Sequence, residues 1–129
     1  MNPCARLEGI LTQNVGKELI LYDRKTQKAH YLNETAAFVW RHCDGTKAVA
    51  DLTRLLRTEL GSPEDQALVS LALDQLETGG LLQASLSAPR VSRRDAMKRL
   101  KVLGIVTALI PVVSTIGAPP PAAAQSVIG

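Results

Sequence analysis

Few side chains in this chain could do chemistry, and their spacing does not favour it. The chain has two histidines and two cysteines, namely His30, His42, Cys4 and Cys43. His42 and Cys43 are adjacent, so on a helix their side chains would point about 100° apart, and with Cys4 they match no common zinc spacing. The sequence also lacks H-x-x-x-H, C-x-x-C, a glycine-rich phosphate loop and G-x-S-x-G. We therefore expect no enzymatic activity, no metal site and no cofactor.

The distribution of charge argues against nucleic acid as a partner. Residues 1–90 carry ten Lys or Arg and eleven Asp or Glu, a net charge of −1, whereas residues 91–129 carry five and one, a net charge of +4. The helix-forming segment from residue 64 to residue 78 has four acidic residues and no basic one. A helix that enters a DNA groove needs positive charge to meet the phosphates. We therefore expect no nucleic-acid partner.

Two features of the sequence favour a peptide as the partner. Lys28–Leu32 is β-prone and could form an exposed sheet edge, to which an extended peptide adds as a strand. His30 in this run is typical of a surface residue, although on a binding edge it could contact a ligand. The second feature is an apolar arc of roughly 200°, at about 100° per residue, on the segment before Thr78. It is formed by Leu68, Val69, Leu71, Ala72, Leu73 and Leu76.

This arc has two interpretations that the sequence leaves open. A helix that packs on one side needs about half of such an arc. The helix is therefore either wedged between two core layers or lines an apolar groove that is open to a partner.

The elements that must position these residues indicate a small α+β domain. Residues 1–6 show no periodicity and are expected to be a loose lead-in. Three strands are predicted at Leu7–Val15, Glu18–Tyr22 and Lys28–Leu32, the last two forming a hairpin. Three helices are predicted at Glu34–Cys43, at Lys47–Leu60 with Thr46 as N-cap, and from Pro63 to about Thr78 with Ser62 as N-cap. The predicted fold is winged helix-turn-helix-like, with a three-stranded antiparallel sheet followed by three helices.

The stretch Tyr31–Gly45 joins the last strand to the first helix and contains the only Trp and the only Phe of the chain. Asn33 is a good N-cap, because its side chain can accept a hydrogen bond from the first helical turn. One helical face carries Ala36, Val39, Trp40 and Cys43. Asp44-Gly45 is expected to end the helix, since glycine tolerates the left-handed conformation that follows a last turn.

The sequence L-N-E-T-A-A-x-V-W, followed by D-G-T, resembles the PqqD family of small peptide-binding proteins, also called RiPP recognition elements. G-x-E-L-I-L-Y-D at residues 16–23 and G-G-L-L at residues 79–82 extend the resemblance over about Leu7 to Leu82. The resemblance implies that the leader of a ribosomally made precursor binds as a strand beside the third strand, against the third helix. The implied contacts are Lys28, Ala29, His30, Tyr31, Leu32, Leu68, Leu71, Ala72 and Gln75. Asn33, Ala36, Trp40, Asp44 and Gly45 match the motif in structural roles.

The resemblance implies a non-catalytic protein that presents the bound peptide to a separate maturation enzyme, often of the radical-SAM type. The named family member serves the biosynthesis of pyrroloquinoline quinone, PQQ. Two alternatives remain at this point. One is a membrane-tethered adaptor that binds a folded protein, and the other is a winged-helix transcription regulator.

The last third of the chain departs from the family. Residues 1–84 are expected to form the peptide-binding domain, 85–91 a linker, and 92–129 a basic and then hydrophobic tail. Ser92–Lys98 resembles a twin-arginine export motif, with Ala where Phe is usual. The apolar run 102–118, interrupted by Pro111, is at the short limit for a membrane span.

Three interpretations of this tail stay open. It is a hydrophobic helix that anchors a cytoplasmic domain to the inner membrane, an export-like segment, or a segment that lies on the surface, is disordered or docks on the domain itself.

Overall fold

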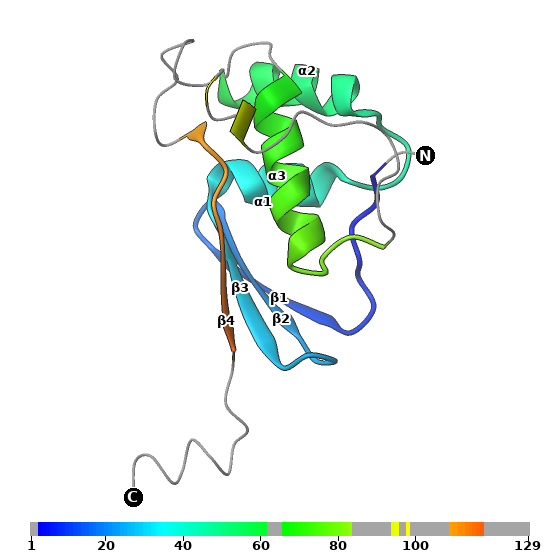
Figure 1. The fold of residues 1–129 in the computed structure, drawn as a ribbon, viewed down its shortest axis with the longest axis vertical. Coiled ribbons are helices and arrows are strands. Elements are labelled where there is room, and N and C mark those ends of the chain that lie inside the picture. The colour runs from blue at the N-terminus through cyan, green and yellow to red at the C-terminus, as the bar shows by residue number, and fades with distance from the viewer. Residues whose placement is uncertain (1–2, 62–65, 84–93, 96–97, 99–108, 118–129) are drawn as a thin grey trace, which may run out of the picture.

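A four-stranded antiparallel sheet and three helices make up the α+β fold of the described residues (Figure 1). The structure is a computed structural model, and it describes residues 3–61, 66–83, 94–95, 98 and 109–117. Strand order follows chain order. The strands are β1 (Ile10–Val15), β2 (Glu18–Asp23), β3 (Lys28–Leu32) and β4 (Val113–Gly117). The helices are α1 (Glu34–His42), α2 (Val49–Leu60) and α3 (Gln66–Thr78).

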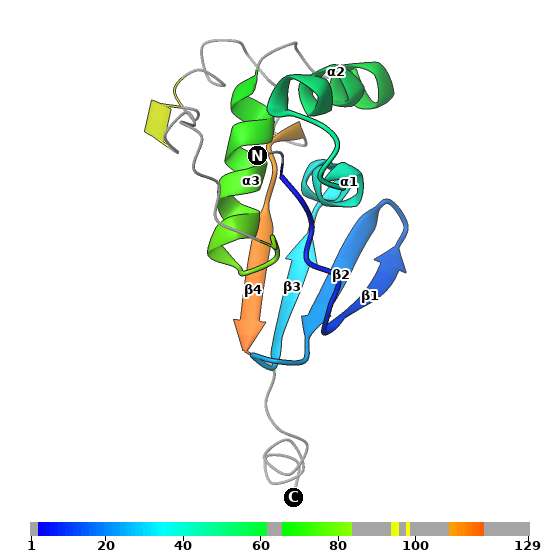
Figure 2. The same cartoon turned by 90° about the vertical axis from the view of Figure 1, so that its right-hand side faces the viewer.

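Alternation of side chains gives the sheet one face that packs on the helices. In β2, Leu19, Leu21 and Asp23 are buried while the residues between them are partly exposed. The antiparallel register places Leu19 opposite Leu32 and Leu21 opposite His30, so these side chains share the helix-facing side. Figure 2 shows the four strands side by side, with the helices gathered on one face and at one end.

Helix α3 is the centre of the core. Seven consecutive residues, Ala67–Leu73, are buried, and Leu76 is fully buried one turn further on. Because successive helical residues point about 100° apart, this half of α3 is covered all round. Both α1 and α2 pack against it. The wedged-helix interpretation is therefore correct for residues 67–73, and no open apolar groove runs along them.

Local signals in the sequence account for the start and end of α1. Asn33 adopts an extended conformation, and its Oδ1 accepts a hydrogen bond from the Ala36 backbone N–H at 3.0 Å. Trp40 lies on the buried face, and its Nε1 donates to the Leu81 carbonyl at 3.2 Å. Gly45 follows the helix with φ at 85°, in the left-handed region. The first helix and the β2–β3 hairpin were both predicted.

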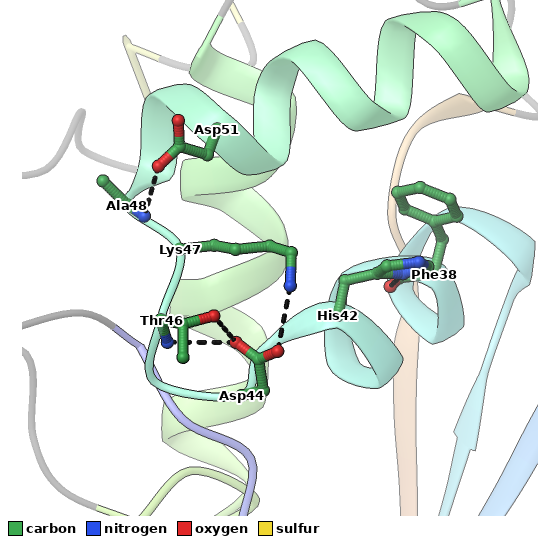
Figure 3. A network of polar contacts seen from close by, with 7 residues as sticks. All are labelled: Phe38, His42, Asp44, Thr46, Lys47, Ala48 and Asp51. Carbon is green, nitrogen blue, oxygen red and sulfur yellow. Dashed lines mark hydrogen bonds and ion pairs between the residues drawn. The ribbon is translucent and has the colours of Figure 1, made fainter.

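The predicted start of α2 was wrong by two residues. Thr46 does not cap the helix, because its N–H and Oγ1 both donate to Asp44 Oδ1 in the preceding loop (Figure 3). Lys47 donates to the other carboxylate oxygen of Asp44 at 2.9 Å. The N-cap is Ala48, whose backbone N–H donates to Asp51 Oδ2 at 3.0 Å. The start predicted for α3, residues 62–65, lies outside the described residues.

The N-terminal residues are not a loose lead-in, which corrects the prediction for residues 3–6. Ala5 is buried, its N–H donates to the Cys43 carbonyl at 2.7 Å, and it forms an isolated bridge with Leu82. Arg6 Nη2 donates to Asp23 Oδ1 at 2.6 Å, and Arg6 Nη1 donates to the Gly80 carbonyl at 2.8 Å. This segment therefore ties the end of β2 to the end of α3, over a separation that periodicity cannot detect.

The fourth strand is the largest correction. The sheet was predicted with three strands. The apolar run 102–118 had three interpretations, namely an anchoring hydrophobic helix, an export-like segment, and a segment that lies on the surface, is disordered or docks on the domain itself. Residues 113–117 are not helical and form β4, which pairs with β3, as docking on the domain requires. Residues 102–108 lie outside the described residues. Within the described part of the chain, the helices are too short or too polar to cross a membrane.

Replacing Leu21 with alanine should lower the free energy of unfolding by about 2–5 kcal/mol, because it removes a fully buried side chain from the sheet–helix interface. Leu11→Ala is the matched control, since Leu11 is 55% exposed on the neighbouring strand. That control should cost less than about 1 kcal/mol. Urea denaturation measures both, and equal losses would contradict the assigned faces of the sheet.

Candidate functional site

The candidate site is the groove between β3 and the C-terminal half of α3, here called the β3–α3 groove. Strand β4 lies in it, antiparallel to β3 and beside α3 in both views (Figures 1 and 2). The register pairs Leu32 with Val113 and continues without a break to Lys28 and Gly117. The predicted peptide-binding edge, Lys28–Leu32, is thus paired along its whole length with an extended segment of the same chain.

Gln75 holds the backbone of this segment from the α3 side. Its Nε2 donates to the Pro111 carbonyl at 2.8 Å, and its Oε1 accepts from the Val113 N–H at 2.8 Å. A primary amide has a donor and an acceptor side by side, so Gln75 satisfies the two backbone groups as a neighbouring strand would. Gln75 was one of the contacts that the family resemblance implied.

Asn33 holds the same segment where it enters the groove. Asn33 Nδ2 donates to the Ile110 carbonyl at 2.8 Å, and Asn33 Oδ1 accepts from the Val112 N–H at 3.1 Å. The Asn33 backbone N–H also donates to the Val112 carbonyl at 3.1 Å. The sequence predicted Asn33 only as a helix cap. Its position at the end of the edge strand was the signal that it could also reach a strand lying alongside.

Within the described part of the chain, His30 is the β3 residue whose side chain hydrogen-bonds the bound segment. Its ring is fully buried, and Nδ1 lies 2.8 Å from Thr115 Oγ1, the residue opposite it in the register. The prediction of a surface histidine was wrong, because the side chain points to the helix-facing side of the sheet. Gly79 packs closely here, since a Cβ on it would lie 3.4 Å from His30 Nδ1.

A pocket of about 310 Å³ opens beside Thr115. Its lining comes from both strands of the groove and from the end of α3, and consists of Lys28, His30, Gln75, Thr78, Gly79, Val113 and Thr115. The pocket leaves space next to the threonine side chain. The groove could therefore hold a larger side chain at this position than the one it holds here.

Burial lowers the pKa of His30 from its ordinary value. The nearby Asp23 carboxylate opposes that effect and raises the pKa, whereas the positive charges of Lys28 and Arg6 lower it further. His30 Nε2 is buried and has no hydrogen-bond partner among the described residues. The neutral ring is therefore the form that the folded site favours.

Three of the implied contacts lie in the core. Leu68, Leu71 and Ala72 are each at most 1% exposed, in the half of α3 that is covered all round. Of the residues implied on α3, Gln75 is the one that the structure brings to β4 by hydrogen bonds. The sequence did not predict Thr78, Gly79 or Thr115 as site residues, and docking of residues 113–117 brings Thr115 to the end of α3.

The described residues contain no cluster of three or more His, Cys, Asp or Glu that could hold a metal ion. Cys43 lies in the core, and burial raises the pKa of its thiol to about 12. A thiol with so high a pKa is a poor nucleophile at neutral pH, because the thiolate is the reactive form. The chemistry that this arrangement supports is therefore the binding of an extended chain.

The fold and the groove define a small α+β domain whose sheet edge takes an added strand. The family model for Coenzyme PQQ synthesis protein D (PqqD) matches residues 18–82, and the chain belongs to the PqqD family. No curated protein and no solved structure matches the chain, so this family model alone carries the assignment. The match begins at β2 and ends after α3, and so excludes β4.

The free energy of unfolding should fall as the pH drops below about 6.5, the ordinary value for histidine. The unfolded chain then takes up a proton on His30 that the folded state resists until the pH reaches the lowered folded-state pKa. The slope from one such proton is at most about 1.4 kcal/mol per pH unit. Urea denaturation between pH 7.5 and pH 5 measures it.

His30→Gln should flatten this dependence, whereas His42→Gln should keep it. Equal pH dependence in the protein and in His30→Gln would show that another group is responsible.

Proposed function

We propose that this protein binds the leader of a ribosomally synthesised precursor peptide and presents it to a modifying enzyme, of the radical-SAM type. The leader adds as a strand to the outer edge of β3, against α3. The observation that carries the proposal is that an extended segment pairs with the whole of β3 in this position. The family assignment supports a non-catalytic, peptide-binding role.

The chemistry of the groove supports recognition of an extended chain rather than of a folded surface. Gln75 and Asn33 each direct a donor and an acceptor at backbone groups of the bound segment. Strand addition gains its affinity from main-chain hydrogen bonds, and pockets for alternate side chains give specificity. Both elements of that mode are present in the groove, with His30 and the pocket beside it supplying the second.

Presentation works by raising the local concentration of substrate. A leader held in the β3–α3 groove keeps its attached core peptide near an enzyme that binds the same carrier, so encounter becomes intramolecular. The carrier itself needs no catalytic group for this. The identity of the bound peptide would show whether the pathway makes PQQ or another modified peptide.

The two alternatives have less support. A transcription regulator would need positive charge on the helix that meets DNA, but α3 contains Asp74 and Glu77 and no Lys or Arg, and most of it is buried. An adaptor would bind a folded surface, whereas Gln75 and Asn33 contact main-chain atoms of an extended segment. The acidic end of α3 favours a leader with Lys or Arg near its anchor residues.

In chains that also carry Ser114→Pro, which weakens the pairing of β4 with the same edge, Tyr31→Pro should weaken leader binding at least tenfold, whereas Tyr31→Ala should change it less than threefold. Asn33 donates its N–H to the Val112 carbonyl across the β3–β4 pair, and backbone hydrogen bonds in an antiparallel ladder recur at every second residue. The Tyr31 N–H therefore faces the added strand, and proline removes it while alanine keeps it. Proline is tolerated at a sheet edge when the missing N–H points away from the sheet.

Sequencing the DNA on both sides of the gene identifies candidate precursors, fluorescein-labelled synthetic leaders of these are the probes, and fluorescence anisotropy measures their affinity. A leader that binds Tyr31→Pro as tightly as Tyr31→Ala would contradict strand addition at β3.

A further inference from the structure

We propose that residues 110–117 are a built-in ligand of the β3–α3 groove and display the peptide pattern that the groove accepts. That pattern is an extended segment with an aliphatic residue followed, two positions later, by a side chain that hydrogen-bonds His30. A peptide with this pattern competes with residues 110–117 for β3. The inference rests on the proposed function, which it extends by naming the ligand class and the competitor.

The groove and its occupant come from different parts of the chain. Asn33, His30 and Gln75 all lie within residues 18–82, which the PqqD family model matches. The segment that they bind begins at residue 110 and is separated from Leu82 by the 27 residues 83–109. The groove residues thus lie in the part of the chain that the family model matches, while the strand that fills the groove lies outside that part.

In residues 113–117, the side chains on one face contact the domain and those on the other face do not. Val113 is partly buried and packs against the core, and Thr115 contacts His30. Ser114, Thr115 and Ile116 are all exposed, Ile116 by 67%, and among these three it is the Thr115 side chain that hydrogen-bonds β3. Residues i and i+2 of a strand share a face, so Val113 and Thr115 both face the groove. The groove therefore constrains these two residues and leaves the residues between and after them free to vary.

A ligand in the same chain has an advantage over a separate peptide. Its binding is intramolecular, and tethered ligands reach effective concentrations on the order of millimolar. A peptide with the same contacts must therefore overcome that concentration before it occupies β3. Weakening the built-in strand should expose the groove to peptides added from outside.

Ser114→Pro in the full chain should increase its affinity for a labelled synthetic copy of residues 109–117 at least tenfold over Ser114→Ala. The Asn33 N–H donates to the Val112 carbonyl, and in an antiparallel pair such bonds recur at every second residue. Two residues after Val112, the Ser114 N–H therefore faces its register partner Tyr31. Proline removes this donor and alanine keeps it, while the exposed side chain is lost in both. Fluorescence anisotropy measures the affinity, and circular dichroism checks that both variants are folded.

Ile116→Pro is a second releasing variant, because the Ile116 N–H is the next donor toward β3 and its side chain is 67% exposed. It should bind the labelled copy as Ser114→Pro does. A copy in which the residue at position 115 is Val instead of Thr keeps the shape and loses the hydroxyl. It should bind either proline variant about five- to tenfold more weakly, as expected for one hydrogen bond.

Each outcome bears on one part of the inference. Equal, measurable binding by the proline and alanine variants would overturn the built-in ligand and leave the proposed function intact. Equal binding of the threonine and valine copies would overturn the role of His30 in selecting the ligand. If neither proline variant bound the copy while leaders still bound in the Tyr31 comparison, this inference would be wrong and the proposed function would stand.

Discussion

The backbone groups along the outer edge of β3 are the constraint on which this site depends. A strand at the edge of a sheet presents N–H and C=O groups that need partners. Here β2 occupies one side of β3 and β4 the other. Asn33 extends the pairing past the end of the strand with its backbone and its side chain. The groove is therefore an edge that another extended chain can complete.

Helix α3 forms one side of the groove and packs on α1 and α2. Residues 67–73 are buried, in a core cluster that also contains Leu19, Leu21 and Leu32 of the sheet. Arg6 adds a further link, since it bonds both Asp23 at the end of β2 and the Gly80 carbonyl after α3. The two sides of the groove are therefore connected by contacts that do not involve β4, as well as by β4 itself.

Asp23 is ionised inside this tie. Burial alone would raise the pKa of its carboxyl, but hydrogen bonds from Arg6, Lys25 and Thr26 outweigh burial and lower the pKa to about 2. The pair contributes stability above the ordinary carboxyl pKa of about 3.9, and that stability is lost as the pH falls toward 2. Near neutral pH the carboxylate keeps its charge beside His30, and the two effects on the histidine oppose each other.

Some groove residues contact the backbone of the bound segment, and another contacts one of its side chains. Gln75 and Asn33 contact main-chain atoms, which every peptide has, so they set position and direction. His30 contacts the Thr115 side chain, so under the proposed function it would distinguish one peptide sequence from another. This division suits a carrier that must hold one stretch of a precursor firmly while leaving the rest of the peptide free for an enzyme.

Local sequence determined the elements of this protein, namely the β2–β3 hairpin, the Asn33 cap, the buried stripe of α1 and the approximate ends of the helices. Those features depend on neighbouring residues, whose periodicity and turn chemistry are visible in the chain. The motifs also determined the family and drew attention to Lys28–Leu32 and Gln75.

Tertiary contacts determined the conformation of segments that lie far from their partners in the sequence. Residues 3–6 pack on the domain and His30 is buried, where the sequence predicted a loose lead-in and a surface residue. Residues 113–117 form a strand, whereas the sequence left an anchoring helix, an export-like segment and a surface-lying, disordered or docked segment open. The apolar run 102–118 is compatible with more than one local conformation. A contact such as His30 with Thr115 joins residues 85 apart in the chain. Pairing with β3 fixed the choice for residues 113–117, because an edge strand supplies hydrogen-bond partners that no local pattern records.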